Sequence, residues 1–159
     1  MKILIVSDTH GYNENLVRAI EIEKPFDKMI HLGDFEDEQN IRRLVNCGII
    51  MVPGNNDYSI ELDKSRVVKI HDYTVFITHG NIYAVNYGYN RVVYAGMEKG
   101  ANIVMFGHTH VPIIDEFDGV TVINPGSLTY PRQEGRKPTY VVMNVDDNGL
   151  AHFELRELN

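Results

Sequence analysis

KILIVSDTHGYNENLVRAIEIEKPFDKMIHLGD, residues 2 to 34, decides the fold class of this chain. An apolar, β-branched run over Lys2–Val6 ends in a polar turn, and a second run of the same kind covers Lys28–Leu32. Between them, apolar residues recur with helical spacing after Asn13, which is a suitable N-cap. Strand, helix and strand in this order predict two parallel strands joined by a helical crossover.

The remainder of the chain continues this pattern and then changes it. The predicted strands are Lys2–Val6, Lys28–Leu32, Ile49–Val52, Val67–Ile70, Thr74–Ile77, Asn102–Phe106, Ile113–Phe117, Val120–Ile123, Tyr140–Val145 and His152–Leu158. Two further helices are predicted, one carrying Ile41, Leu44 and Val45 and one over Tyr89–Lys99, closed by Gly100. Turn residues at 71–72, 118–119 and 146–149 predict hairpins in the second half. We therefore expect one α/β domain over residues 1–159, with a sheet sandwich flanked by helices.

Composition limits the classes of function. Of the 159 residues, 43% are hydrophobic and 23% are charged, which is ordinary for a soluble globular protein. Cys47 is the single cysteine, so a disulfide framework within the chain is excluded and a reducing compartment is expected. No apolar run approaches transmembrane length, and the first residues lack the pattern of a secretion signal. We expect a cytoplasmic protein with no membrane partner.

The net charge argues against extended nucleic-acid binding. Fifteen Lys and Arg against 22 Asp and Glu give a formal charge of −7, whereas a nucleic-acid binder normally carries a basic patch. A small phosphorylated substrate remains compatible with this charge. It would require a local positive centre, which bound metal ions could supply.

Compact polar clusters follow one predicted strand after another. They are Ser7–His10, Gly33-Asp34, Gly54–Asp57, His79-Gly80, Gly107–His110 and Asn124–Ser127. The carboxyl ends of strands in α/β sheets gather at one edge, where ligands bind. Asp8 with His10, and His108 with His110, are i, i+2 pairs whose side chains face the same way in extended backbone. Carboxylate and imidazole groups gathered at one edge indicate a site for divalent metal.

Each cluster also has a purely structural interpretation. Residues 8–11 fit a helix-entry turn, Gly33-Asp34 and VPGNND (52–57) fit turns, and His79 alone fits a hydrogen-bonded strand end. Five ligand-bearing clusters, all at strand ends, favour the metal site over turn chemistry alone. The other histidines separate from them: we expect His31 to be buried in a supporting role, and His71 and His152 to be solvated.

The motif order DTH, GD, GNND, HG and GHTH resembles the calcineurin-like metallophosphoesterase superfamily. The short chain and the segment NPGS at 124–127 resemble the small bacterial and archaeal phosphodiesterase family that includes the YfcE proteins. The resemblance runs from Asp8 to Arg132. It implies a four-layer αββα sandwich of two mixed sheets flanked by helices, and a metal-dependent phosphoesterase that hydrolyses small phosphodiesters.

The resemblance also implies a ligand set and a mechanism. One metal ion would be held by Asp8, His10, Asp34 and His110. The second would be held by Asp34, Asn55, His79 and His108, with the Asp34 carboxylate bridging. Oxygen and imidazole ligands suit manganese, our first choice, as well as iron, zinc or nickel. A hydroxide bridging the two ions would attack phosphorus in line with the leaving group.

Two positions depart from the family pattern. Asn56 stands where the superfamily generally has a histidine that assists the leaving group, and Asn81 stands where small relatives often have a second histidine. An amide cannot act as a general acid. We therefore expect Asn56 to contact substrate and to shift specificity toward diesters with acidic leaving groups, unless another donor supplies the proton.

Outside the metal motifs, Arg132 is either a phosphate contact or a surface arginine beside Pro131. Four tyrosines after His79 suggest helix packing or a homo-oligomer interface, with base stacking as an alternative; they are Tyr83, Tyr87, Tyr89 and Tyr94. Two rival functions stay open. One is a phosphomonoesterase acting on a small metabolite, and the other is a binding scaffold like the retromer subunit that has this fold and a degraded metal site.

Overall fold

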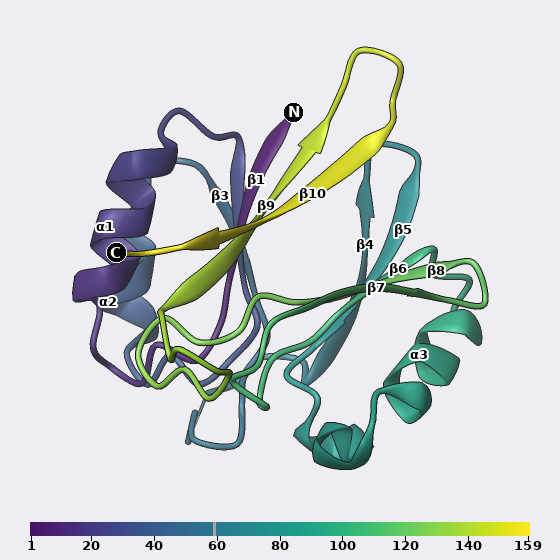
Figure 1. Ribbon diagram of the computed structural model, residues 1–159, viewed down its shortest axis with the longest axis horizontal. Helices are drawn as coiled ribbons and strands as arrows, with labels where there is room; N and C mark the ends of the chain where they lie inside the picture. Colours follow the sequence, from purple (N-terminus) through teal and green to yellow (C-terminus); the bar gives the residue numbers. More distant parts are fainter. Residues whose placement is uncertain (59) are drawn as a thin grey trace.

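The computed structural model describes residues 1–58 and 60–159, and in them ten strands form two five-stranded sheets (Figure 1). The first sheet has the order β10-β9-β1-β2-β3. Its strands are β1 (Lys2–Val6), β2 (Lys28–His31), β3 (Gly48–Met51), β9 (Thr139–Val145) and β10 (Ala151–Glu157). β1, β2 and β3 are parallel, as the crossover pattern predicts, and β9 joins β1 antiparallel.

The second sheet has the order β4-β5-β6-β8-β7. Its strands are β4 (Ser65–Ile70), β5 (Tyr73–Thr78), β6 (Ile103–Met105), β7 (Ile113–Phe117) and β8 (Val120–Asn124). β5, β6 and β8 run parallel, while β4 and β7 pair antiparallel at the two edges. The three predicted hairpins are confirmed, because β4 pairs with β5, β7 with β8 and β9 with β10 across those turns.

Helices cover the outer face of each sheet. α1 (Glu14–Glu23) and α2 (Glu38–Arg43) lie against the first sheet, and α3 (Asn90–Met97) lies against the second (Figure 1). Two short 3₁₀ turns, η1 (Asn81–Tyr83) and η2 (Val85–Tyr87), lead into α3. The expected four-layer αββα sandwich is therefore confirmed. None of the helices in the described residues has the length and apolar character needed to cross a membrane.

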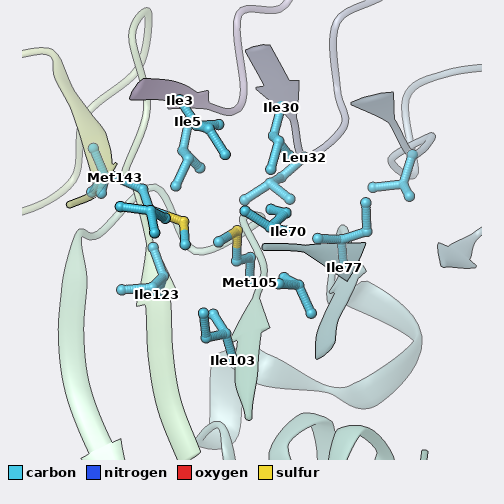
Figure 2. Packing of buried hydrophobic residues seen from close by; sticks show 14 residues of the cluster. Ile3, Ile5, Ile30, Leu32, Ile70, Ile77, Ile103, Met105, Ile123 and Met143 are labelled. Carbon is cyan, nitrogen blue, oxygen red and sulfur yellow. The ribbon is translucent and has the colours of Figure 1, made fainter. Parts of the chain in front are cut away.

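Apolar side chains point alternately to the two faces of each strand and so fill the space on both sides of each sheet. In β1, Ile3 and Ile5 point into the space between the two sheets, whereas Leu4 and Val6 point to the face covered by α1 and α2. Figure 2 shows the inter-sheet cluster, in which isoleucines of one sheet meet Ile77, Ile103, Met105 and Ile123 of the other. Each fully buried isoleucine stabilises the fold by roughly 1.5–3 kcal/mol. The layers thus hold the strand ends in fixed positions.

The helix ends differ from prediction in small ways. α2 ends at Arg43, with Leu44 as its C-cap, so Val45 packs from beyond the helix. α3 spans Asn90–Met97, because the chain turns before Gly100, whose φ is +72°. Asn13 occupies the N-cap of α1, but its side chain makes no capping hydrogen bond among the described residues.

Candidate metal centre

The predicted ligands come together where five strands end, at the seam between the two sheets. Asp8 and His10 follow β1, Asp34 follows β2, and Asn55 follows β3 in the first sheet. From the second sheet, His79 directly follows β5, and His108 and His110 follow β6. The functional side chains therefore come from both sheets.

One group of ligand atoms forms around His10 and His110. Nε2 of His110 lies 3.1 Å from Oδ1 of Asp8 and 3.3 Å from Nε2 of His10. Nε2 of His10 lies 3.7 Å from Oδ2 of Asp34. Imidazole nitrogens and carboxylate oxygens converge here at distances that a shared cation would bridge.

A second group forms around His79. Its Nε2 lies 3.1 Å from Oδ1 of Asn55, 3.5 Å from Oδ2 of Asp34 and 3.3 Å from Nδ1 of His108. Oδ1 of Asp8 is 3.9 Å from the same nitrogen. Asp8 and Asp34 thus lie between the two groups, and all seven predicted ligands are brought together.

Backbone carbonyls orient two of the four imidazoles. Nδ1 of His79 donates to the carbonyl of Leu32 at 2.7 Å, and Nδ1 of His110 donates to the carbonyl of Tyr130 at 2.7 Å. These bonds leave both Nε2 atoms as lone-pair donors aimed into the site.

The other two imidazoles have side-chain partners. Nδ1 of His10 contacts Oε1 of Glu36 at 2.8 Å, which again leaves Nε2 facing the site. Nε2 of His108 lies 3.0 Å from the amide nitrogen of Asn86. A 180° rotation of that amide would let Nε2–H donate to the amide oxygen and leave Nδ1 of His108 for a cation.

The buried carboxylates fit a metal site. Oδ1 of Asp8 is fully buried and has no hydrogen-bond partner among the described residues, although a cation at this point would satisfy it. Burial opposes ionisation of Asp8 and Asp34, but the nearby histidines outweigh it and lower both pKa values. The same carboxylates raise the pKa of His79 despite its burial. Both carboxylates are therefore available as anionic ligands.

The backbone carrying the ligands is not extended, so the expected geometry of the two i, i+2 pairs is wrong. Asp8, His10, Asp34, His108 and His110 have φ values between 48° and 67°, in the left-handed region. This conformation costs non-glycine residues roughly 1–2 kcal/mol each, and Asp and His tolerate it better than most. The pairs converge because tight turns after β1 and β6 redirect them, not because of strand alternation.

Asp57 organises two of these turns, a role that our reading of the sequence did not assign. The residue is 8% exposed, and its carboxylate accepts backbone N–H groups of Asp34, Glu36 and Gly54, each at 2.7 Å. Gly54 lies so close that a Cβ there would be 2.1 Å from Oδ1 of Asp34. In the sequence, this role of Asp57 is indicated only by its place as the last residue of GNND, directly after two asparagines.

The NPGS segment holds the other turns. The hydroxyl of Ser127 donates to the carbonyl of Asp8 at 2.7 Å. The amide of Asn124 donates to the carbonyl of Gly107 and to the hydroxyl of Thr109, both at 2.9 Å. This segment therefore fixes the β1 turn against the β6 turn, which accounts for its place beside the ligand motifs.

The two residues predicted to touch substrate lie beside ligands. Asn56 donates its backbone N–H and its side-chain amide to the two oxygens of Asp34, each at 2.8 Å. Arg132 is exposed, and its backbone N–H donates to the carbonyl of His110 at 3.0 Å.

The remaining histidines lie where they were expected. His31 is fully buried against the hydroxyl of Thr9, and burial lowers its pKa to about 3. His71 and His152 are exposed.

Three of the four tyrosines pack on the second sheet. Tyr83 meets Phe76 edge-on, and Tyr89 and Tyr94 meet Phe117 in the same way. Tyr87 is 94% exposed, so it has no packing role within the described chain. The helix-packing interpretation is confirmed for the other three.

Several known proteins resemble this chain in sequence. The model of the calcineurin-like phosphoesterase superfamily domain matches residues 1–148. A probable metallophosphoesterase of Bacillus subtilis, YsnB, is 31% identical over 95% of this chain and 88% of its own length. Phosphodiesterase MJ0936 of Methanocaldococcus jannaschii is 34% identical over 79% of this chain and 83% of its own.

A solved structure agrees as well. A predicted phosphoesterase of Streptococcus pneumoniae superposes with a TM-score of 0.80 and 26% identity, covering 98% of this chain and 97% of that one. Sequence and fold therefore match over nearly the whole chain. It belongs to the calcineurin-like phosphoesterase superfamily and is a metal-dependent phosphoesterase.

Proposed function

We propose that this chain, as one catalytic domain over residues 1–159, is a dinuclear phosphodiesterase that hydrolyses small phosphodiesters. The observation that carries the proposal is the arrangement of seven ligand side chains in two groups, with the carboxylates of Asp8 and Asp34 between them. Two divalent ions held there would supply positive charge for the phosphate and a shared water acidic enough to attack as hydroxide.

The charge balance supports an anionic substrate. Asp8 and Asp34 contribute −2 to the site, and the remaining ligands are neutral imidazoles and the amide of Asn55. Against about +4 from two divalent ions, the loaded site keeps a net positive charge within a chain of −7. A phosphate therefore finds its attractive field at this seam between the sheets.

Asp34 has the position expected of a bridging ligand. Its Oδ2 lies 3.7 Å from Nε2 of His10 and 3.5 Å from Nε2 of His79. Asn56 holds this carboxylate with two hydrogen bonds of 2.8 Å. Asn56 therefore orients the bridge, and its amide can donate to a phosphate oxygen after rotation away from Asp34.

Asn56 also favours diesters over monoesters. An amide donates hydrogen bonds but cannot transfer a proton to a departing alkoxide, a function worth about 10²–10⁴-fold in rate. Acidic leaving groups need no such proton. Phosphomonoesterase activity, the alternative, would require a proton donor that we do not identify among the described residues.

A scaffold role is the second alternative, and the ligand set weighs against it. A degraded metal site would lack donors, whereas every predicted position here carries a ligand-competent side chain. Oδ1 of Asp8 is buried and has no hydrogen-bond partner in the part of the chain that the structure describes, which favours a bound cation as its partner.

The decisive assay compares bis-p-nitrophenyl phosphate with p-nitrophenyl phosphate, each with Mn²⁺ and with chelator. We expect Mn²⁺-dependent hydrolysis, with the diester preferred. Fe²⁺, Zn²⁺ and Ni²⁺ are tested in parallel, because the ligand set admits them. Absence of metal-dependent hydrolysis of both compounds would refute the proposal.

Asp34→Ala tests the bridge directly. Metal analysis of the purified variant should show loss of bound Mn²⁺ relative to the unaltered chain. Asp63→Ala is the matched control, since this exposed aspartate lies outside the ligand groups. Retention of two ions in Asp34→Ala would overturn the ligand assignment.

A further inference from the structure

A hollow lies beside the His10 and His110 half of the site. Its volume is about 560 Å³, and it is lined by Thr129, Tyr130, Pro131, Arg132 and Arg136. It adjoins the ligands directly, because the carbonyl of Tyr130 accepts Nδ1–H of His110, and the ring centroid of Tyr130 lies 5.3 Å from that of His10. A substituent of the phosphate that extends to this side of the site would enter the hollow.

The hollow carries two arginines that have no acidic partner within residues 1–58 and 60–159. Arg132 and Arg136 are both exposed, and neither takes part in an ion pair among the described residues. Glu134, which lies between them in the chain, is exposed, and Glu36 of the site is bound to His10. In a chain of net charge −7, two uncompensated guanidinium groups four residues apart form a local positive field.

The loop that carries these arginines is tied down. The backbone N–H of Arg132 donates to the carbonyl of His110 at 3.0 Å, and that of Arg136 donates to the carbonyl of Gln133 at 3.1 Å. The side-chain amide of Gln133 donates to the carbonyl of Lys137 at 2.7 Å. Arg136 itself has a φ of 45°, a conformation unfavourable for an arginine. The guanidinium groups therefore extend from a fixed base next to the ligands.

A different hollow is suited to the leaving group. It has a volume of about 340 Å³ and is lined by Pro53, Gly54, Asn55, Asp57, Ile60, Leu62, Lys64 and Asn81. Asn55 belongs to the His79 group of ligands, and Asn56 stands where the family assists the leaving group. Because attack occurs in line with the leaving group, the ester substituent that stays on phosphorus (the retained arm) lies toward the other end of the site, near Tyr130.

We propose that Arg132 and Arg136 bind a second phosphate, carried by the retained arm of the diester. The inference rests on the proposed function and narrows its substrate class to diesters with an additional phosphate monoester. Guanidinium groups pair with phosphate oxygens through two parallel hydrogen bonds, which suits this class. The ring of Tyr130, 49% exposed, offers a face for the sugar or base between the two phosphates.

Two chromogenic compounds that differ by one phosphate test the proposal. They are the p-nitrophenyl ester of thymidine 5′-phosphate and the same ester with a 3′-phosphate added. We expect the 3′-phosphate to raise kcat/KM about tenfold or more, and Arg136→Gln to reduce this ratio about tenfold. Arg43→Gln, an exposed arginine at the end of α2, is the matched control and should leave the ratio unchanged.

Binding gives a readout independent of turnover. Calorimetry with Mn²⁺-loaded protein should show thymidine 3′,5′-bisphosphate binding at least tenfold more tightly than thymidine 5′-phosphate, and Arg136→Gln should remove that difference. Equal affinities, or a preference that Arg136→Gln leaves intact, would overturn the inference. Hydrolysis of the plain ester without a 3′-phosphate effect would refute the second-phosphate site and leave the phosphodiesterase intact. If neither ester is hydrolysed, the proposed function is refuted, and calorimetry still decides whether the arginines bind phosphate.

Discussion

Asn56 is the residue at which this chain's chemistry departs most from its family pattern. Its amide holds Asp34 and offers no titratable proton. Asn56→His should therefore add a general acid beside the leaving group. We expect diesters with poor leaving groups, such as unsubstituted phenol, to gain about 10²-fold in kcat, within the range typical of acid catalysis. Nitrophenyl diesters should change little, because their leaving groups need no proton.

The measurement is a plot of rate against leaving-group pKa at saturating metal for a series of substituted phenyl diesters. The unaltered chain should show a steep dependence and Asn56→His a flatter one. Asn56→Ala is the control, since it removes the bonds to Asp34 without adding an acid. A flat plot for the unaltered chain would mean that another residue already donates the proton.

Asp57 supports the ligand Asp34 through the backbone. Three N–H groups converge on its carboxylate, and an amide in its place would present only one acceptor oxygen. Asp57→Asn should lower the free energy of unfolding by about 1–3 kcal/mol, the cost of leaving a buried donor unpaired. It should also weaken Mn²⁺ binding, because Asp34 and Gly54 are fixed by the same bonds. Urea unfolding and Mn²⁺ titration measure the two effects, and unchanged values in both would contradict this role.

The side chains that come together as candidate ligands could be named from sequence, whereas the residues that orient them could not. Asp8 and His110 belong to short motifs that follow apolar strands, and the motif order reveals them. Glu36 and Asn86 act only through contacts to His10 and His108, 26 and 22 residues away, and neither lies in a recognisable pattern. The significance of Arg136 likewise depends on a hollow formed by the fold, which no local sequence pattern indicates.

Among the elements, α1 is joined to the first sheet by a buried acid as well as by its apolar face. Glu23, 5% exposed, accepts from the ammonium group of Lys2 at 2.8 Å and from the hydroxyl of Tyr140 at 2.8 Å, with Arg156 at 3.7 Å. Burial alone would raise the pKa of Glu23, but these partners lower it below its ordinary value of 4.5. The charged form is thus the one that stabilises the fold.

Glu23→Gln should lower the free energy of unfolding by about 1–3 kcal/mol at pH 7, since the amide leaves the ammonium of Lys2 without its charge partner. Because the native pKa is depressed, this contribution is complete above pH 4.5 and disappears as the pH falls through the native value. Urea unfolding of the unaltered chain and of Glu23→Gln at pH 7 and pH 4 measures this effect. The difference between their free energies of unfolding should be smaller at pH 4 than at pH 7.

Glu21→Gln is the matched control for this element. Glu21 pairs with Lys24 on the exposed side of the same helix, with 64% and 50% of the two side chains accessible. Such surface pairs contribute at most about 1 kcal/mol, so this change should have little effect at either pH. An equal loss of unfolding free energy in Glu21→Gln and Glu23→Gln would show that the charge of the helix, and not the buried contact, stabilises the fold.

Strand positions were predictable because their apolar runs are distinct, but the turns after them were not. The position of polar clusters directly after the strands correctly indicated that the segments after β1, β2 and β6 lie at one edge. Their left-handed backbone at Asp8, Asp34 and His108 follows from hydrogen bonds to Ser127, Asp57 and other distant groups, not from local propensity. The sequence-based assumption of extended pairs failed there for this reason.

At the scale of the whole molecule, the site joins the two sheets. Asp8 and Asp34 follow strands of the first sheet, while His79 and His110 follow strands of the second. Imidazole nitrogens of the second pair lie 3.1–3.9 Å from carboxylate oxygens of the first. A cation bound by both sheets binds the folded chain and not the unfolded one, so it stabilises the fold. A cation held there would also offset the strain of the left-handed turns that carry the candidate ligands.

Mn²⁺ should therefore raise the thermal stability of this chain. At 100 times its Kd, one bound ion contributes about 2.7 kcal/mol, which for a chain of this size raises Tm by roughly 5–10 °C. Calorimetric scans with Mn²⁺ and with chelator measure the shift, and Asp34→Ala should abolish it while Asp63→Ala retains it. The increase in Tm should reach a plateau as the Mn²⁺ concentration rises and the sites fill. Equal Tm values with metal and with chelator would show that the seam between the sheets does not hold the ions. If Mn²⁺ still raises the Tm of Asp34→Ala, the stabilising ion is bound elsewhere. The stability gained from metal would then not come from the site proposed for catalysis.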